Sequence, residues 1–217
     1  MAIKLKKTSG YHLNGVKMLV YGLSGSGKTC LIPTLPKPVV ISVEGGLLSI
    51  AKANIDYIEV RTLEELEEAY EFVVNSDYES IALDSISEIA EVILNFEKKI
   101  NKDIRNAYGI MQEKITDLIR SFRDIQGKNV FFTAKMEKIQ DESSKVLFFP
   151  SMPGNKIAQS LPYFFDEVFA LHISDDSERV LQTTLDKSYT AKDRSGELDS
   201  FEPADLGKII DKIKGVK

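Results

Sequence analysis

Gly22-Leu23-Ser24-Gly25-Ser26-Gly27-Lys28-Thr29 follows directly after the apolar run 16–21. This octapeptide matches the phosphate-binding pattern G-x-x-x-x-G-K-[ST] at each required position. Its glycines let the backbone curl so that successive N–H groups face phosphate oxygens, while Lys28 offers positive charge to the β- and γ-phosphates and Thr29 offers a hydroxyl to Mg²⁺. We therefore predict a site for a nucleoside triphosphate and Mg²⁺ here.

The loop is expected to open a short helix. The positive end of the helix dipole would add to the attraction for phosphate, and Pro33 and Pro36 end the helix early because proline cannot continue it. Cys30 follows in the first turn and is included among the nucleotide-binding residues, its thiol being a small buried filler rather than a reactive group. A glycine-rich turn without a ligand is the alternative that this motif leaves open.

Length and composition narrow the class of protein. The 217 residues are expected to form one domain, 1–217, with its core at about 15–210 and a last helix at about 203–214. Apolar residues make up 43% of the chain, yet no apolar run reaches the roughly 20 residues of a membrane span, so no membrane partner is expected. The start of the chain lacks the apolar core of a secretion signal, and the single Cys30 cannot form an internal disulfide. We therefore expect a cytoplasmic protein.

Charge is unevenly distributed along the chain. The net charge of −5 argues against indiscriminate binding to polyanions. Residues 59–91 hold 11 acidic residues and one basic residue, a balance of −10, whereas residues 98–128 hold 8 basic and 4 acidic residues, a balance of +4. The second stretch predicts a local basic surface, although two solvated helix faces of opposite sign would give the same counts.

Apolar, β-rich runs alternate with helical patterns. The expected strands are 17–21, 38–43, 57–60, 80–83, 129–133, 167–172 and 179–184. The expected helices are 63–75, 85–100, 109–126 and 204–214, whose apolar residues recur on one helical face. This alternation is typical of an α/β fold, in which helices cover both faces of a mostly parallel twisted sheet. Two polar segments interrupt it: 137–155 is long for a simple connection and is expected to be mobile or functional, and 189–198 is a polar insertion after a strand.

A carboxylate at the end of an apolar strand usually completes the Mg²⁺ site of a phosphate-loop protein. Asp84 follows the apolar strand 80–83 and is the candidate for this role. An Asp that only caps the following helix would give the same pattern. Ser85, and not a glutamate, follows Asp84, so the base that activates water must come from elsewhere in the chain.

Glu44 is the candidate for that base. It ends the apolar run 39–43 and precedes two glycines. Because the carboxyl ends of parallel strands meet at one edge of a sheet, where ligands bind, Glu44 is expected near the phosphate loop. A carboxylate there can orient and deprotonate the water that attacks the γ-phosphate. Otherwise Glu44 merely begins a glycine-rich turn.

Lys192 and Arg194 lie two positions apart in Lys192-Asp193-Arg194-Ser195-Gly196. Side chains at this spacing share a face of an extended segment, so the two cations are candidates to stabilise charge on the γ-phosphate. If the segment lies far from its own nucleotide, it must act on a neighbouring subunit. A solvated basic turn is the alternative.

Taken together, these features resemble the ATPase core of RecA-like proteins. The closer resemblance is to the phage-encoded P-loop nucleotide-binding proteins related to RecA, a small single-domain family that includes single-strand annealing recombinases. The resemblance spans about residues 15–210. It rests on three short motifs: Ser42-Val43-Glu44-Gly45-Gly46, Leu161-Pro162-Tyr163-Phe164-Phe165-Asp166-Glu167-Val168 and Ala191-Lys192-Asp193-Arg194-Ser195-Gly196.

The resemblance implies a Mg²⁺-dependent ATPase with Glu44 as the water-activating base and Asp84 as the metal carboxylate. Lys192 and Arg194 match the K-x-R-x-G fingers that such proteins insert into the site of an adjacent subunit. It thus implies a homo-oligomer, a ring or a filament, which would work in the cytoplasm of the bacterial host if the protein is phage-encoded.

The resemblance also implies single-stranded DNA as a partner, together with a single-strand DNA-binding protein. The expected DNA-lining stretches follow the helix after Asp84 and the strand that ends at Thr133. Tyr108, in the basic stretch, is a candidate stacking ring. Phe148 and Phe149 either stack on bases or pack on the sheet, and we expect packing.

The chain departs from the RecA-like pattern in two ways. RecA-like recombinases often have a glutamine where this chain has Thr133-Ala134-Lys135, and Lys135 is the candidate substitute. The chain also lacks room for separate DNA-binding domains, so annealing or protection of single strands is expected rather than strand exchange.

Other functions are compatible with the phosphate loop. A small-molecule kinase needs a lid with several arginines, and residues 107–123 offer only Arg120 and Arg123. A GTPase usually carries N-K-x-D, which residues 133–137 match poorly. An accessory ATPase in packaging or replication, driven by a protein partner, also agrees with the sequence.

Overall fold

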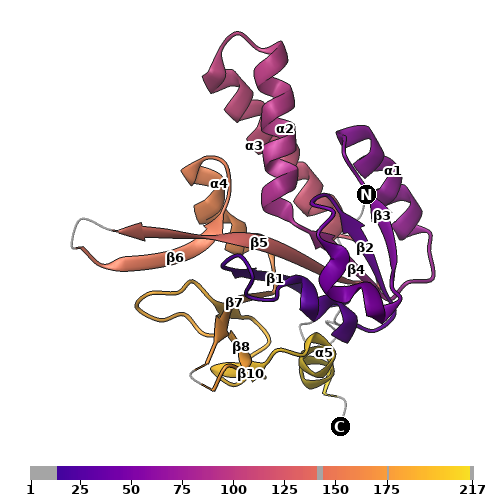
Figure 1. Ribbon diagram of the computed structural model, residues 1–217, viewed down its shortest axis with the longest axis vertical. Helices are drawn as coiled ribbons and strands as arrows, with labels where there is room; N and C mark the ends of the chain where they lie inside the picture. Colours follow the sequence, from indigo (N-terminus) through magenta and orange to yellow (C-terminus); the bar gives the residue numbers. More distant parts are fainter. Residues whose placement is uncertain (1–13, 141–143, 175, 216–217) are drawn as a thin grey trace, which may run out of the picture.

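The computed structural model describes residues 14–140, 144–174 and 176–215. Within these ranges, ten strands join in one sheet of order β10-β8-β7-β1-β5-β4-β2-β3, with β6 added beside β5 and β9 beside β7 (Figure 1). The strands are β1 (Lys17–Gly22), β2 (Pro38–Ser42), β3 (Asp56–Glu59), β4 (Ser80–Asp84), β5 (Asn129–Gln140), β6 (Val146–Ser151), β7 (Glu167–Ile173), β8 (Arg179–Gln182), β9 (Lys192–Asp193) and β10 (Phe201–Pro203).

The helices of the same ranges include three short 3-10 segments. The α-helices are α1 (Leu63–Val74), α2 (Ile86–Ile100), α3 (Ile104–Arg123), α4 (Asn155–Ser160) and α5 (Leu206–Lys214), and the 3-10 segments are η2 (Thr29–Thr34), η3 (Leu47–Ala53) and η4 (Leu161–Phe164). None of the helices in the described residues has the length and apolarity of a membrane span.

The centre of the sheet is parallel. Strands β3, β2, β4, β5, β1 and β7 run in one direction, whereas β6, β8, β9 and β10 pair in antiparallel fashion. β5 lies between β1 and β4, with Gly22 opposite Lys135 and Leu83 opposite Phe132. The carboxyl ends of β1, β2 and β4 therefore meet at one edge, where open α/β sheets bind their ligands.

Side chains alternate between two buried cores, one on each face of the sheet. In β1, Leu19 and Tyr21 pack with the core under α1, α2 and α3, while Met18 and Val20 pack with the core under η2, η3 and α5. This alternation is the period-two geometry of a strand that is buried on both faces. The predicted α/β class, with a mostly parallel sheet between helices, is confirmed.

Polar caps decide where the longer helices begin. Thr62 and Glu65 form a capping box at α1, and the side chain of Ser85 accepts from the backbone N–H of Glu88 at α2. α3 begins at Ile104, five residues before the predicted start, because Asp103 caps it. α2 and α3 form a hairpin that projects beyond the sheet (Figure 1).

The polar segment 137–155 contains regular structure that its sequence pattern did not predict. In its described part, β5 continues to Gln140 and pairs with β6 in antiparallel fashion, and the two strands extend from the sheet (Figure 1). The segment 189–198 contains β9, which pairs with β7. The helix expected after the phosphate loop is the six-residue 3-10 helix η2, which is short because Pro33 and Pro36 prevent its continuation.

Candidate nucleotide site

The phosphate loop leaves the carboxyl end of the central strand β1. Gly25 and Gly27 have φ angles of 76° and 97°, in the left-handed region that side-chain-bearing residues rarely adopt. The backbone N–H of Ser26 donates to the carbonyl of Leu23 across 3.2 Å and closes the turn. The backbone of the loop thus favours glycine at Gly25 and at Gly27, the second glycine that the motif requires.

Lys28 curls back over the loop. Its Nζ donates to the carbonyls of Gly22 and Leu23, at 2.9 and 3.0 Å. Burial lowers the pKa of Lys28, while the nearby carboxylates of Asp84 and Glu44 act in the opposite direction. Phosphate oxygens, which carry full negative charge, would be stronger acceptors for this ammonium than the two carbonyls.

Asp84 is buried at the end of β4, with an exposed fraction of 4%. One carboxylate oxygen accepts from the hydroxyl of Thr29 at 2.8 Å, and the other accepts from the hydroxyl of Thr133 at 2.5 Å. Thr133 lies on β5, the strand between β1 and β4. Two hydroxyls therefore hold the carboxylate in place, that of Thr29 at the end of the phosphate loop and that of Thr133 on the neighbouring strand β5.

Glu44 is held at the same edge by Ser85. The hydroxyl of Ser85 donates to Oε1 of Glu44 at 2.5 Å, and the peptide bond between Asp84 and Ser85 is cis. Ser42 lies opposite Asp84 in the sheet, so the turn after β2 brings Glu44 to the end of β4, where Asp84 lies. The structure brings together Lys28, Thr29, Asp84 and Glu44, as the sequence predicted for their positions. Their chemical roles remain predictions.

The residues present fit a magnesium ion. Mg²⁺ prefers oxygen ligands and is usually held by one or two protein groups together with waters and phosphate oxygens. Thr29 and Asp84 supply a hydroxyl and a carboxylate that already lie within hydrogen-bond distance. Both oxygens border the loop that would bind the phosphates.

Lys135 also reaches this edge, at the position opposite Gly22. Its Nζ donates to Glu88 at 2.7 Å and to Glu91 at 2.9 Å, both on α2, and its backbone N–H donates to Ser87. Burial acts to lower the pKa of Lys135, but the two carboxylates outweigh burial and raise it to about 12. The ammonium is therefore charged and held between the site and α2.

The sequence alone missed two contacts of the site. The hydroxyl of Thr133 on Asp84 and that of Ser85 on Glu44 join strands and loops far apart in the chain. The only signal for them was a hydroxyl residue at the end of each strand. Cys30, in contrast, is the expected free thiol and is partly buried.

Lys192 and Arg194 are not brought to the phosphate loop. Lys192 Nζ donates to the carbonyls of Pro162, at 2.8 Å, and Phe165, and burial lowers its pKa. Arg194 forms an ion pair with Asp166 at 2.8 Å. Both lie near the amino end of β7, where Lys192 is opposite Val168. The site of the same chain therefore does not contain them.

The aromatic candidates are packed against the protein. The ring of Phe148 stacks on that of Tyr189, with centroids 4.5 Å apart and planes 10° apart, which confirms packing for Phe148. Tyr108 packs against the core, and Lys98 lies over its ring at 5.1 Å from the centroid. Each ring therefore already has a partner within the protein.

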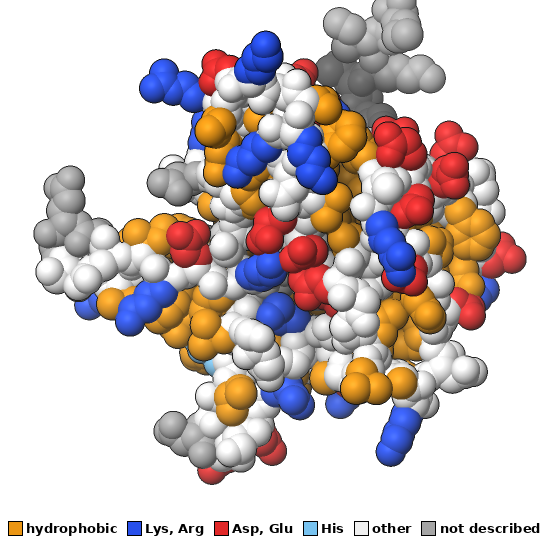
Figure 2. All heavy atoms as spheres, turned by 45° about the horizontal axis from the view of Figure 1, so that its top comes forward, with side chains coloured by type: hydrophobic (Ala, Val, Ile, Leu, Met, Phe, Trp, Pro, Cys, Tyr) orange, Lys and Arg blue, Asp and Glu red, His pale blue; other side chains and the backbone are white. Residues whose placement is uncertain are grey.

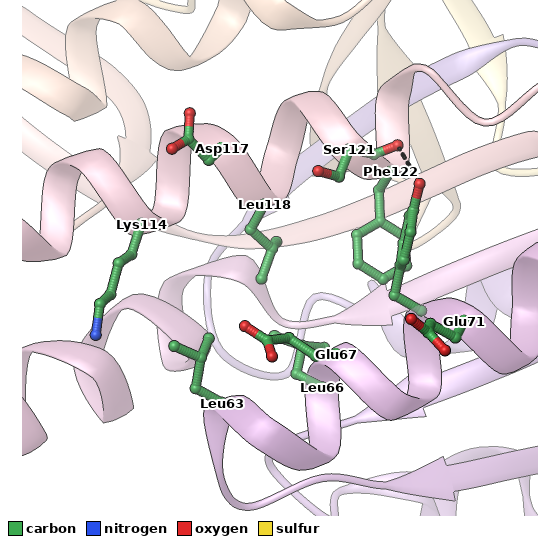
Figure 3. A pocket seen from close by; sticks show the side chains of 10 residues that line it. Leu63, Leu66, Glu67, Glu71, Lys114, Asp117, Leu118, Ser121 and Phe122 are labelled. Atoms are coloured by element: carbon green, nitrogen blue, oxygen red, sulfur yellow. Dashed lines mark hydrogen bonds between the residues drawn. The ribbon is translucent and has the colours of Figure 1, made fainter.

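Two cavities can be compared with this site. A cavity of about 430 Å³ lies between α1 and α3, where Glu67, Tyr70 and Lys114 are among its lining residues (Figure 3). No residue of the phosphate loop lines it. A cavity of about 360 Å³ borders the loop itself and is lined by Ser24, Gly25, Met136 and Tyr189, among others. The second cavity is the one that adjoins the nucleotide chemistry.

Comparison with known proteins agrees with the geometry of the loop and its carboxylates. A family model described as an AAA domain matches residues 14–195. A search of curated proteins found no match. The match covers most of the chain, including β1 with its phosphate loop, Asp84 on β4 and Thr133 on β5. The chain therefore belongs to the AAA domain family of P-loop ATPases.

Proposed function

We propose that the protein is a Mg²⁺-dependent ATP hydrolase that assembles head to tail and binds single-stranded DNA in phage recombination, as an annealing-type protein of the host cytoplasm. One observation supports the hydrolase activity above all: four side chains lie close together at one edge of the sheet, those of Lys28, Thr29, Asp84 and Glu44. The resemblance to phage RecA-like proteins supports the role in recombination.

The chemistry follows from the contacts of these residues. Lys28 would exchange the carbonyls of Gly22 and Leu23 for the β- and γ-phosphates. Mg²⁺, when bound, would neutralise charge on the phosphates. Glu44 accepts the attacking water's proton, and the hydroxyl of Ser85 keeps that carboxylate oriented toward the site.

The end of the α2–α3 hairpin supports the DNA-binding part of the proposal. Exposed basic side chains gather there, and Figure 2 shows Lys and Arg side chains over this end of the molecule. The basic residues of the tip are Lys98, Lys99, Lys102 and Arg105. Phosphate neutralisation by such a cluster is the main source of sequence-independent affinity for nucleic acid.

The position of Lys192 and Arg194 supports assembly. Both cations lie away from the phosphate loop of their own chain, in contact with residues 162–166. If they act on ATP, they must therefore act on the nucleotide of a neighbouring subunit. This is the arrangement proposed for a head-to-tail ring or filament.

The decisive experiment measures ATP hydrolysis with and without single-stranded DNA, beside the mass in solution with a non-hydrolysable ATP analogue. Lys28→Ala should lose hydrolysis under both conditions. A variant with the four basic tip residues changed to Gln should keep basal hydrolysis but lose DNA stimulation and the gel shift at low salt. A matched control changes Lys52, Lys187, Lys208 and Lys214, four exposed lysines elsewhere, to Gln.

The outcomes separate the parts of the proposal. If Lys28→Ala hydrolyses ATP as fast as wild type, the proposed hydrolase activity of this site is wrong. Absence of both DNA stimulation and a gel shift at low salt would overturn the DNA-binding part alone. Ile100 and Ile104 are each 62% exposed beside the basic tip. If only the DNA part fails, these residues favour an ATPase driven by a protein partner.

A further inference from the structure

Arg179, the first residue of β8, reaches the phosphate loop from two strands away. β8 pairs with β7, with Ile173 opposite Arg179, and β7 lies beside β1. The Nε of Arg179 donates to the backbone carbonyl of Ser26 across 2.9 Å. An arginine more than 150 positions away in sequence is thus in direct contact with the loop.

The same side chain fills the space beside Gly27. A Cβ atom on Gly27 would lie 2.2 Å from Nε of Arg179, and 2.9 Å from its Cδ and Cζ. The guanidinium therefore occupies the space that a side chain at this position would need. Gly27 and Arg179 fit together as a pair, in addition to the positive φ of Gly27.

Among the described residues, none neutralises the charge of Arg179. Within the described part of the chain, no carboxylate forms an ion pair with it, and its one polar contact is the carbonyl of Ser26. A guanidinium carries five N–H donors, so four remain for another acceptor. The side chain is exposed to solvent at the edge of the loop.

We propose that Arg179 is a second cation of the nucleotide site, which binds the phosphate chain from the β8 side while Lys28 binds it from within the loop. This inference rests on the proposed nucleotide-binding function. A guanidinium suits the task because its planar donors pair with two phosphate oxygens at once, unlike a lysine ammonium. It also requires no partner subunit, in contrast to Lys192 and Arg194.

The alternative is that Arg179 only braces the loop through Ser26. Arg179→Gln distinguishes the two roles, because its amide can still donate to the carbonyl of Ser26 but carries no charge. Arg179→Lys keeps the positive charge. Arg179→Ala keeps neither the charge nor the donor to the carbonyl of Ser26. The matched control is Arg123→Gln, which removes the same charge from the end of α3, where Arg123 pairs with Asp124.

The experiment measures the affinity for MgATP and for inorganic tripolyphosphate, at several salt concentrations, and the melting temperature of each variant. Arg179→Gln should bind both ligands about 10-fold more weakly than wild type and with a smaller salt dependence. Arg179→Lys should retain most of the affinity, and Arg123→Gln should match wild type.

Several results would overturn the inference. Wild-type affinity in Arg179→Gln, with a lowered melting temperature in Arg179→Ala, would assign a bracing role instead. A loss for MgATP without a loss for tripolyphosphate would assign a contact to the base or ribose. If wild type and Lys28→Ala bind MgATP equally, the proposed nucleotide function itself fails; if only Arg179→Gln behaves as wild type, this inference fails alone.

Discussion

The hydroxyl of Thr29 donates to the carboxylate of Asp84 across 2.8 Å and joins the phosphate loop to β4. β5 lies between β1, which leads into the phosphate loop, and β4, which carries Asp84, and its Thr133 binds the other oxygen of the same carboxylate. The two groups expected to bind Mg²⁺ are therefore already adjacent in the folded chain. This arrangement makes Asp84 and its hydroxyl partners the first targets for mutation.

Thr133→Val should raise the Mg²⁺ concentration that hydrolysis requires. Thr133 is fully buried, and valine has nearly its shape, so the change removes the hydrogen bond to Asp84 with little change in volume. We expect a loss of stability of roughly 1–3 kcal/mol and a Mg²⁺ requirement raised about 10-fold. Thermal unfolding and Mg²⁺ titration of ATP hydrolysis measure the two effects.

Thr183→Val is the matched control for this change. Thr183 is also fully buried, and its hydroxyl donates to the carbonyl of Asp199 at 2.6 Å, in a different part of the sheet. It should lose comparable stability but keep the wild-type Mg²⁺ requirement. Equal Mg²⁺ curves for both valine variants and wild type would contradict a role of Thr133 in the metal site.

Glu44→Gln should bind ATP normally but hydrolyse it at least about 100-fold more slowly, because an amide cannot take the proton of the attacking water. Ser85→Ala should have a milder effect of about 10-fold, since it removes the hydroxyl that holds Glu44 but leaves the carboxylate. Single-turnover hydrolysis and nucleotide binding separate chemistry from affinity. Glu59→Gln, on the exposed end of β3, is the control.

Normal turnover in Glu44→Gln would show that another group activates the water. In that case Glu44 only begins the turn after β2, which is the alternative that its sequence context left open. A slow Ser85→Ala beside a normal Glu44→Gln would likewise separate the serine from the proposed base.

Arg194→Ala should leave ATP binding by the single subunit unchanged and reduce hydrolysis in the assembly about 100-fold, because the lost cation would serve the neighbouring nucleotide. Mixing it with Glu44→Gln protein should restore part of the activity, since some interfaces then combine an intact Glu44 with an intact Arg194. Hydrolysis is measured against mixing ratio, with Arg123→Ala as control. A mixture with no more activity than its components would argue against a finger in trans.

Glu167→Gln should change how stability depends on pH. Burial, and next the neighbouring Asp193, raise the pKa of Glu167 to about 8, although its carboxylate accepts from the backbone N–H groups of Ser195 and Arg194. Between about pH 4.5 and 8, the folded protein then holds a proton that the unfolded chain has released, so this group makes stability fall as pH rises. In Glu167→Gln that contribution disappears.

Melting temperatures across this pH range test the prediction. The curve of Glu167→Gln should fall less with rising pH than that of wild type, and the two should differ most above pH 8. The control is Glu197→Gln, which changes an exposed glutamate after β9 and should follow the curve of wild type. Parallel curves for wild type and Glu167→Gln would mean that Glu167 ionises as an ordinary carboxylate.

Local sequence patterns determined much of the fold. The apolar runs predicted the strands that became β1, β2, β3, β4, β7 and β8 and the first part of β5. The signal is strongest in β1, β2 and β4, because strands buried on both faces need continuous apolar side chains. The β5–β6 hairpin escaped prediction, since it extends from the sheet and its half-exposed residues need no such pattern.

The sequence by itself determined the phosphate loop and placed Asp84 and Glu44 at strand ends, because a motif with obligatory glycines and an apolar strand are both local properties. Only the tertiary structure decided that Thr133 binds Asp84, that Ser85 holds Glu44 and that Arg179 fills the space beside Gly27. Each of these contacts depends on strand order and register. Those are set by the packing of the whole sheet, which no single segment of the chain encodes.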